Sequence, residues 1–205
     1  PLVGVAIDDT KLRKTGRCIV QAFHQRDPMS PPFHTNLILG LRFLQASLLV
    51  PLYRGGPFSC RALPVRFEES SPAKKPGKRA SEEEWQAYKQ CRKERNLSTH
   101  CVAMLGELRA CLDAAGAQKK TMVVALDGSF CNRRVFGADR DRTQLIARAR
   151  KDAVLCFRAP EGERRFYAQE KFTPEQVRQD DTVAWKTTKI FYGGKCRKVR
   201  YKEIK

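Results

Sequence analysis

The chain has 205 residues, with 40 Lys and Arg against 22 Asp and Glu, which gives a formal net charge of +18. A hydrophobic content of 41% is enough for a packed core and excludes global disorder. The length suits one domain with room for an inserted subdomain, and the charge favours a polyanionic partner, first of all nucleic acid. Ribosomal or membrane-surface binding would produce the same total charge, so the charge alone does not choose among these partners.

Eight cysteines are scattered along the chain without a CxxC pair, and the three histidines do not complete a zinc-ligand spacing with them. In a chain of this length, this pattern indicates buried thiols in a reducing compartment. The longest apolar stretch, around residues 37–52, contains Arg42 and Gln45 and is too short and polar to cross a bilayer. We therefore expect a cytoplasmic protein with no membrane contact.

Three strands are predicted in the first third of the chain. Residues 3–9 (VGVAIDD) form a short apolar run typical of a buried strand, and residues 17–25 alternate as a second strand would. Residues 37–50 fit a third strand better than a helix because Pro51 closes the run. A basic linker rich in Pro, Gly and Ser follows at residues 68–80.

Helices and strands then alternate. Ser81 and Glu84 form a capping box for a helix to about Arg95, and Ser98 is expected to cap a second helix that ends at Gly116. The remaining expectations are a fourth strand at 121–126, a helix at 139–150, a fifth strand at 152–159 and a hairpin around 193–194. Trp85, Trp185 and the apolar stripe at 102–112 are most simply explained as core residues.

This order predicts an α/β fold: a mixed sheet of the RNase-H-like kind, with a β-rich region at the C-terminus. The expected segments are the first three strands at 1–67, the linker at 68–80, the helices with two further strands at 81–160, and an incomplete β-rich insertion at 161–205. Both chain ends fall in strand-like runs, so we expect a fragment of a longer protein.

Two of the predicted strands stop on an aspartate. The first ends in Asp8 and Asp9, and the fourth (MVVALDG) ends in Asp127. Taken singly, each is more simply a turn residue or a helix cap. In a sheet of this order, however, the first and fourth strands lie side by side and parallel, so their terminal carboxylates meet at one edge. Carboxylates that converge in this way suit Mg²⁺ or Mn²⁺, which act in phosphodiester chemistry.

Alternate residues of a strand face opposite sides of the sheet, so Asp8 and Asp9 cannot both reach one metal ion. We favour Asp9 as the ligand and expect Asp8 to cap or bond nearby backbone. The choice between the two stays open at this point.

Three stretches carry a resemblance to a known family. IDDTKLRKTG resembles the block that opens the catalytic core of DDE-type insertion-sequence transposases, and VVALDGSFCNRRVF with LIARARKDAVLCFRA resembles the block around their second aspartate. YGGKCRKVRYKEI resembles the β-rich insertion of the bacterial branch. The resemblance implies a bacterial, nucleoid-associated enzyme that hydrolyses DNA phosphodiesters and transfers strands, with transposon ends and target DNA as partners. It leaves room for a homodimer in the complete protein.

Carried over by position, the resemblance places the catalytic and metal-binding aspartates at Asp9 and Asp127. The family's third acid is a glutamate on a helix beyond the β-rich insertion, and its pattern is not found here. We expect none of the C-terminal glutamates to lie in a helix, and we expect the isolated chain to be inactive. These glutamates are Glu161, Glu163, Glu170, Glu175 and Glu203.

Basic residues occur in two groups, one after Asp127 and one near the C-terminus. Lys198, Arg200 and Lys202 alternate and would share one face of a strand, where they either form a solvated surface or contact phosphates. Four arginines after the second aspartate are expected to line the same DNA path. They are Arg133, Arg134, Arg140 and Arg142.

Two other functions remain open. The chain could be a non-catalytic nucleic-acid-binding protein that kept a transposase fold, which a missing third acid would favour. A basic structural RNA-binding protein is the third possibility, and it predicts no dependence on metal.

Overall fold

A computed structural model of the protein describes residues 1–205 except 17, 28, 32, 53–59, 166 and 205. The contacts within the chain divide it into two compact units, which we name unit 1 (Pro1–Ala147) and unit 2 (Arg148–Lys205). This division falls earlier than the segment boundary expected at residue 160. The region expected to supply the fifth strand therefore belongs to unit 2.

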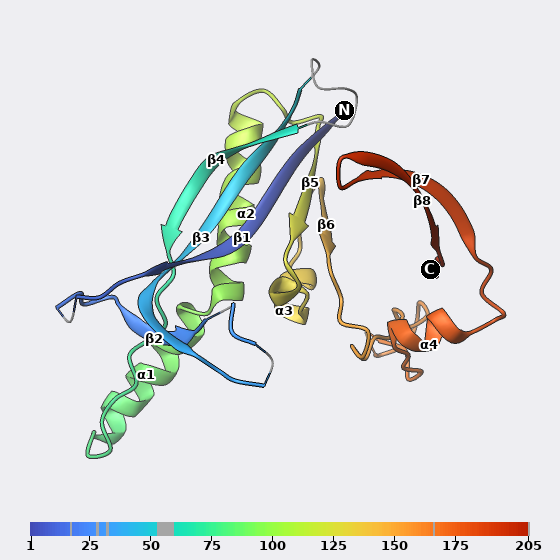
Figure 1. Cartoon of the computed structure of the whole chain (residues 1–205). Helices are drawn as coiled ribbons and strands as arrows, with labels where there is room; N and C mark the ends of the chain where they lie inside the picture. The colour runs from blue at the N-terminus through green and yellow to red at the C-terminus, as the bar shows by residue number, and fades with distance from the viewer. Residues whose placement is uncertain (17, 28, 32, 53–59, 166, 205) are drawn as a thin grey trace. The chain divides into compact units, whose positions relative to one another are not determined.

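Unit 1 contains a mixed sheet in the order β2-β3-β1-β5-β6, with β4 paired to β3 (Figure 1). β1 is antiparallel to β3 and parallel to β5, and β6 is parallel to β5. The mixed α/β class is therefore confirmed, as is the predicted parallel pairing of the first strand with the strand at 121–126. The strands are β1 (Leu2–Arg13), β2 (Phe23–Arg26), β3 (Leu37–Pro51), β4 (Cys60–Glu69), β5 (Thr121–Leu126) and β6 (Thr143–Ala147).

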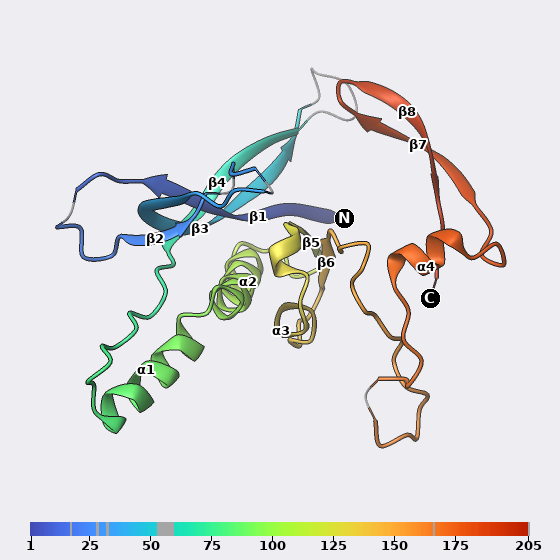
Figure 2. The same cartoon turned by 60° about the horizontal axis from the view of Figure 1, so that its bottom comes forward.

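The core of unit 1 lies between one face of this sheet and its helices. Alternate residues of β1, β3 and β5 point to this face, and helix α2 (Leu97–Ala114) packs against them. Figure 2 shows α2 and the short helix α3 (Arg133–Phe136) on the same side of the sheet. The fully buried side chains include Ile7, Leu44, Met104, Leu105, Met122, Val124 and Phe130.

Two helices connect β4 to β5, as predicted. Helix α1 (Glu82–Glu94) starts at the expected capping box, in which Ser81 Oγ accepts from the Glu84 N–H and the Glu84 carboxylate accepts from the Ser81 N–H. The N-cap of α2 is Asn96 rather than Ser98, because the Asn96 side chain accepts from the Ser98 N–H at 2.9 Å. Gly116 follows the end of α2 with a φ of 79°, which only glycine adopts at low cost.

The helix predicted over 139–150 is wrong. Residues 143–147 form strand β6, in which Leu145 packs against the core and Ile146 is exposed, and this alternation is that of a strand. Only the four residues of α3, together with a 3₁₀ turn at Gly128–Phe130, are helical between β5 and β6. The expected strand at 152–159 is also absent: this described segment forms two isolated bridges instead, Leu155 with Phe172 and Arg158 with Tyr167.

Strand β4 was not predicted, and the second predicted strand is shorter than expected. Of residues 17–25, only the part from Phe23 onward forms strand β2, and residue 17 lies outside the described residues. β4 contains Pro64, which normally argues against a strand. Here it lies on an edge strand beside an irregularity in the β3–β4 register, where a missing N–H is tolerated.

Unit 2 is built on the hairpin of β7 (Lys186–Tyr192) and β8 (Lys195–Tyr201), preceded by the short helix α4 (Pro174–Gln179). The predicted turn at Gly193-Gly194 is confirmed. Both glycines have positive φ, 60° and 76°, as a two-residue hairpin turn requires. Ala159 is the single buried hydrophobic residue among the described residues of this unit.

Two sequence-based expectations about exposure need correction. Cys101 is buried, but Cys18, Cys60, Cys111 and Cys196 are exposed, so the scattered cysteines are not generally core residues. Trp185 is 44% exposed and does not belong to a core. Within the described residues, none of the helices combines the length and apolar character needed to cross a membrane.

Candidate active site on the open face of unit 1

The register between β1 and β5 brings two carboxylates together. Val5 pairs with Val124 and Ile7 with Leu126, and these four side chains point toward the helices. The next residue of each strand, Asp8 and Asp127, therefore lies on the opposite face, which α2 and α3 do not cover. The Asp127 charge also contributes to the pKa of Asp8, which indicates that the two carboxylates are within electrostatic reach.

The last pair of this register is Ile7 with Leu126, so Asp127 follows β5 beside Asp8, whereas the sequence led us to favour Asp9. Asp9 lies opposite Leu44 of β3, on the side of the sheet that carries the core. Its nearby charge is a cation: burial lowers the pKa of Arg42, and the Asp9 carboxylate partly offsets this effect. The pairing of Asp9 with Asp127 is thus not the one that the strand geometry provides.

The surroundings of Asp8 oppose its ionisation. Desolvation raises the pKa of the Asp8 carboxyl, and the negative charges of Asp9 and Asp127 raise it further. One interaction acts the other way, since Asp8 Oδ1 accepts from the Asp9 N–H at 2.8 Å. This bond confirms the prediction that Asp8 bonds nearby backbone. The net effect on the pKa of Asp8 is still a rise, as expected for neighbouring carboxylates without a cation between them.

Asp127 also has a local structural role. It is the N-cap of the 3₁₀ turn at Gly128–Phe130, where Asp127 Oδ2 accepts weakly from the Ser129 N–H at 3.4 Å. The interpretation of Asp127 as a cap is therefore confirmed. A carboxylate has several further acceptor positions, so one long hydrogen bond leaves Asp127 able to bind a cation.

The two carboxylates are suitable as part of a Mg²⁺ or Mn²⁺ site. Among the described residues, none of Asp8, Asp9 and Asp127 forms an ion pair with Lys or Arg. Mg²⁺ is held by one or two carboxylates, and water and phosphate oxygens complete its shell. In the part of the chain that the structure describes, no group of three His, Cys, Asp or Glu side chains is arranged to hold a metal. The arrangement fits a site with two protein ligands.

One of the five C-terminal glutamates departs from expectation. Glu175 lies in the first turn of α4, so the prediction that all five lack a helical setting is wrong. Its carboxylate is engaged by Arg178, with Nη2 to Oε1 at 2.6 Å and Nε to Oε2 at 3.0 Å. This ion pair lowers the pKa of Glu175 and keeps it ionised.

The four arginines after Asp127 do not lie along one path. Arg142 precedes β6 at the amino end of the parallel strands and pairs with Asp113, Asp141 and the Gln118 carbonyl. Since Asp127 lies at the other end of β5, the expectation that Arg142 lines the same path is wrong. Arg140 is partly buried near the Cys101 thiol, and desolvation lowers the pKa of its guanidinium.

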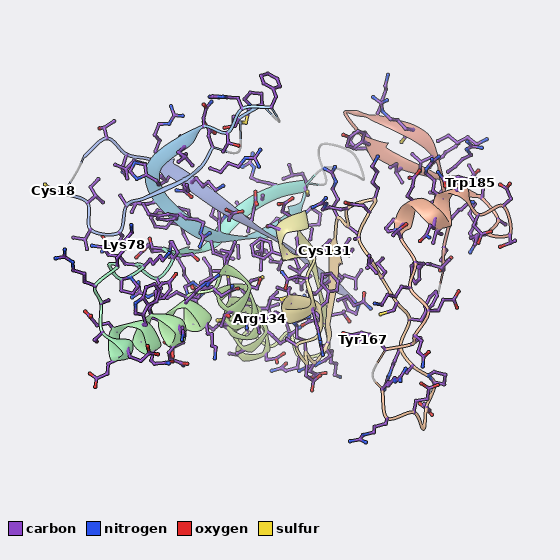
Figure 3. All side chains as sticks on the ribbon, turned by 90° about the horizontal axis from the view of Figure 1, so that it is seen from below. Cys18, Lys78, Cys131, Arg134, Tyr167 and Trp185 are labelled. Carbon is purple, nitrogen blue, oxygen red and sulfur yellow. The ribbon has the colours of Figure 1, made fainter. Side chains whose placement is uncertain are left out.

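Arg133 and Arg134, by contrast, lie in α3, immediately beyond the turn that Asp127 caps, and both are exposed. Figure 3 shows Arg134 beside the helices of unit 1. Its Nη1 donates to Thr99 Oγ1 at 2.5 Å and to the Lys93 carbonyl at 3.4 Å. Its guanidinium therefore has a fixed position near the junction of α1 and α2.

The basic hairpin of unit 2 has the face that the sequence predicted. In the β7–β8 register, Lys198 lies opposite Lys189 and Arg200 opposite Thr187, so Lys198 and Arg200 share a face. Arg200 and Lys202 both lie over the Trp185 ring, at 5.1 and 4.9 Å from its centre. Figure 3 shows Trp185 in this unit. We name these five residues (Trp185, Lys189, Lys198, Arg200 and Lys202) the hairpin basic face.

A like-charge pair directly across two strands is unfavourable, so Lys189 and Lys198 weaken the hairpin unless an anion lies over them. Sequence reasoning did not identify Lys189 or Trp185 as members of this face. The signal was present for Lys189, because a two-residue Gly-Gly turn fixes the register and hence the residue opposite Lys198.

Comparison of the chain with protein-family models, with curated proteins and with solved structures found no match. The functional interpretation therefore depends on the site geometry, on the charge distribution and on the sequence resemblance stated above.

Proposed function

We propose that the chain is the catalytic core of a DDE-type DNA transposase with an RNase-H-like sheet, in which Asp8 and Asp127 bind Mg²⁺ or Mn²⁺. The observation that carries this proposal is the juxtaposition of the two carboxylates on the open face of adjacent parallel strands. In a chain with a net charge of +18, an exposed acidic pair without a cationic partner among the described residues is unusual enough to need a reason. Binding of a divalent cation would explain the pair, because Mg²⁺ is held by one or two carboxylates.

A bound Mg²⁺ would activate the attacking water or 3′-hydroxyl and stabilise the leaving oxygen of a phosphodiester. The role of Asp8 and Asp127 is to hold this cation on the face of the sheet opposite α2 and α3, where it would meet a DNA strand. Deprotonation of Asp8 is then coupled to cation binding, because the cation removes the repulsion that raises the pKa of this carboxyl. Basic side chains of Arg133, Arg134 and the hairpin basic face would contact the DNA phosphates.

The proposal is tested by titrating Mg²⁺ or Mn²⁺ while following the aspartate resonances by NMR. Asp8→Asn and Asp127→Asn should each abolish most of the response. Asp9→Asn is the matched control, since it removes the same charge one residue away on the other face of the sheet. A response that survives both Asp8→Asn and Asp127→Asn, or one that Asp9→Asn abolishes, would contradict the proposed site.

Catalysis is tested separately with plasmid nicking. With two carboxylates of the expected three, the 205-residue chain should nick DNA slower by several powers of ten than a complete site, because each ~1.4 kcal/mol of lost transition-state stabilisation costs tenfold in rate. Ready nicking that Asp127→Asn abolishes would show that the third acid already lies within these residues.

The alternative is a non-catalytic nucleic-acid-binding protein that retains the fold. The hairpin basic face favours this alternative, because it needs no metal to bind phosphates. The two functions differ in one measurement: DNA binding without any metal response at Asp8 and Asp127 would select the alternative.

A further inference from the structure

A second basic site lies in unit 1, on the helix side of the sheet. Residues of α1, the α2 N-cap Asn96 and Arg134 of α3 line an open pocket of about 400 Å³. It is lined by four cations and three side-chain amides, and we name it the α1–α3 pocket. These residues are Gln86, Lys89, Gln90, Arg92, Lys93, Asn96 and Arg134.

The spacing of the residues on α1 places them together. Gln86, Lys89, Gln90 and Lys93 recur at intervals of three and four, so they form one face of the helix. Trp85 lies one turn before Lys89, and its ring contacts Tyr88 edge to face at 5.9 Å. Helix α1 has no buried residue, so the face formed by Gln86, Lys89, Gln90 and Lys93 is a polar and positive surface that is not packed in the core.

The cations in this pocket are not neutralised by carboxylates. Among the described residues, Lys89, Arg92 and Lys93 form no ion pair, and no Asp or Glu lines the pocket. The nearest acid in sequence, Glu94, accepts from the Gln90 amide at 2.6 Å. Four positive charges around one pocket repel one another, and an anion would relieve that repulsion.

The helix dipole explains only part of this cluster. Arg92 and Lys93 lie in the last turn of α1, where cations interact favourably with the carboxyl end of a helix. Lys89 lies before that turn, and Arg134 comes from a different helix. Arg134 is moreover held in place by Thr99 Oγ1 and the Lys93 carbonyl, so its position at the pocket is fixed before any ligand binds.

We propose that the α1–α3 pocket binds a phosphate group of the DNA backbone. This inference depends on the proposed function for the identity of its ligand. The link is the segment from Asp127 to Arg134, which passes from the open face of the sheet to the helix side, where Phe130 and Val135 enter the core. A strand engaged at Asp127 and continuing along this segment would reach the pocket. The pocket would therefore position DNA rather than take part in its cleavage.

The test uses the full chain with Lys89, Arg92 and Lys93 all changed to Gln. These three side chains are exposed, so the variant should fold, and its metal response at Asp8 and Asp127 should match the wild type. The matched control changes Arg61, Lys119 and Lys120 to Gln. These residues are also exposed, and they lie at the amino end of β5 and at the start of β4, away from the pocket.

Binding of duplex DNA is measured over a range of salt concentrations. Each phosphate that the pocket neutralises contributes about 0.9 to the slope of log affinity against log salt. We expect the pocket variant to lose about 0.9 or more of this slope and the control variant to lose less. Equal losses in the two variants would overturn the inference, because general charge alone would then explain binding.

The remaining outcomes separate the inference from the proposed function. If the wild type binds DNA and the pocket variant keeps the full slope of log affinity against log salt, the inference about the pocket is overturned and the proposed function is not. If the wild type binds no DNA, both fail. Titration with inorganic phosphate, followed on Lys89 and Lys93 by NMR, distinguishes the source of the anion: binding of free phosphate with an unchanged DNA slope would assign the pocket to a small phosphorylated ligand and overturn a backbone contact.

Discussion

Unit 1 and unit 2 are held together in different ways. Among its described residues, unit 1 has thirteen buried residues in one cluster, drawn from three strands, α2 and the segment after β5. Unit 2 has one buried hydrophobic residue among its described residues, Ala159, and it leaves Phe157, Trp185 and Ile190 between 39% and 44% exposed. Since burial of apolar surface is the main favourable term in folding, unit 1 should be stable by itself and unit 2 only weakly so. The candidate metal site therefore lies on the rigid unit, and the hairpin basic face lies on the weakly held one.

The largest expected effect follows from removing a core ring of unit 1. Phe130 is fully buried, so Phe130→Ala should lower the free energy of unfolding by about 3–5 kcal/mol. Phe172→Ala in unit 2 removes a partly exposed ring whose centre lies 4.8 Å from that of Phe157. Loss of this ring contact should lower the free energy of unfolding by about 0.5–1.5 kcal/mol, in addition to the contribution of the apolar surface that the ring buries. Residue-resolved hydrogen exchange would measure both changes in the whole chain. Equal costs would break the distinction between the two units.

A smaller effect is expected from the thiols. Burial raises the pKa of Cys101 to about 11, whereas Cys196 is exposed on the hairpin. At pH 8, a thiol reagent should modify Cys196 at once and Cys101 only when unit 1 opens. Immediate modification of Cys101 would indicate that the core of unit 1 is not closed.

The same shift predicts a pH dependence of stability. Between the ordinary pKa of 9.0 and about 11, the unfolded chain loses the Cys101 proton while the folded chain keeps it. The free energy of unfolding should therefore fall as pH rises through this window, and the contribution of Cys101 is fully present below pH 9. Comparison with Cys101→Ala isolates it from other groups that titrate there. Identical pH profiles for the two proteins would contradict the burial of this thiol.

A third effect concerns the salt dependence of DNA binding. Changing Lys198, Arg200 and Lys202 to Gln should flatten the slope of log affinity against log salt by about 0.9 for every phosphate that these residues neutralise. Lys186, Lys195 and Arg197 belong to the other face of the same hairpin and form the matched control set. If both sets change the slope equally, the hairpin has no preferred nucleic-acid face.

The smallest effect has opposite signs in stability and in binding. Lys198→Thr removes the repulsion with Lys189 directly across the strands, so it should stabilise the hairpin by about 0.2–1 kcal/mol while weakening DNA binding. Hydrogen exchange at the β7–β8 amides and the DNA affinity together provide the measurement. A hairpin destabilised by Lys198→Thr would show that the lysine pair contributes packing that outweighs its repulsion.

The strands β1, β3 and β5 could be predicted because each contains an apolar run, but β1 continues beyond the predicted end at Asp9 to Arg13. The same runs contained the information that separates Asp8 from Asp9. Large residues alternate with small ones in β1, and Asp8 is in phase with Gly4 and Ala6, away from the core. Asp127 is in phase with Ala125 in β5, which is likewise exposed. A comparison of the two phases therefore indicates that Asp8, rather than Asp9, shares a face of the sheet with Asp127.

Other features could not be predicted from local sequence. The role of Arg142 depends on Asp113 and Gln118, which are distant in sequence and meet it only through the packing of α2 beside β5. The α1–α3 pocket likewise combines a helix face with Arg134, more than forty residues beyond Lys93. Strand β4 was missed because its Pro64 is tolerated only at an irregular position on a sheet edge.

The parallel pairing of β1 with β5 also determines when the acidic pair can form during folding. Every paired residue of β5 lies 119 positions after its partner in β1, from Leu2 with Thr121 to Ile7 with Leu126. The hairpin-like contacts of β1, β3 and β4 close much shorter loops and can form while the chain is still being synthesised. Asp8 and Asp127 meet only after β5 has left the ribosome and joined β1, so a nascent chain that already contains Asp8 does not yet hold the assembled acidic pair.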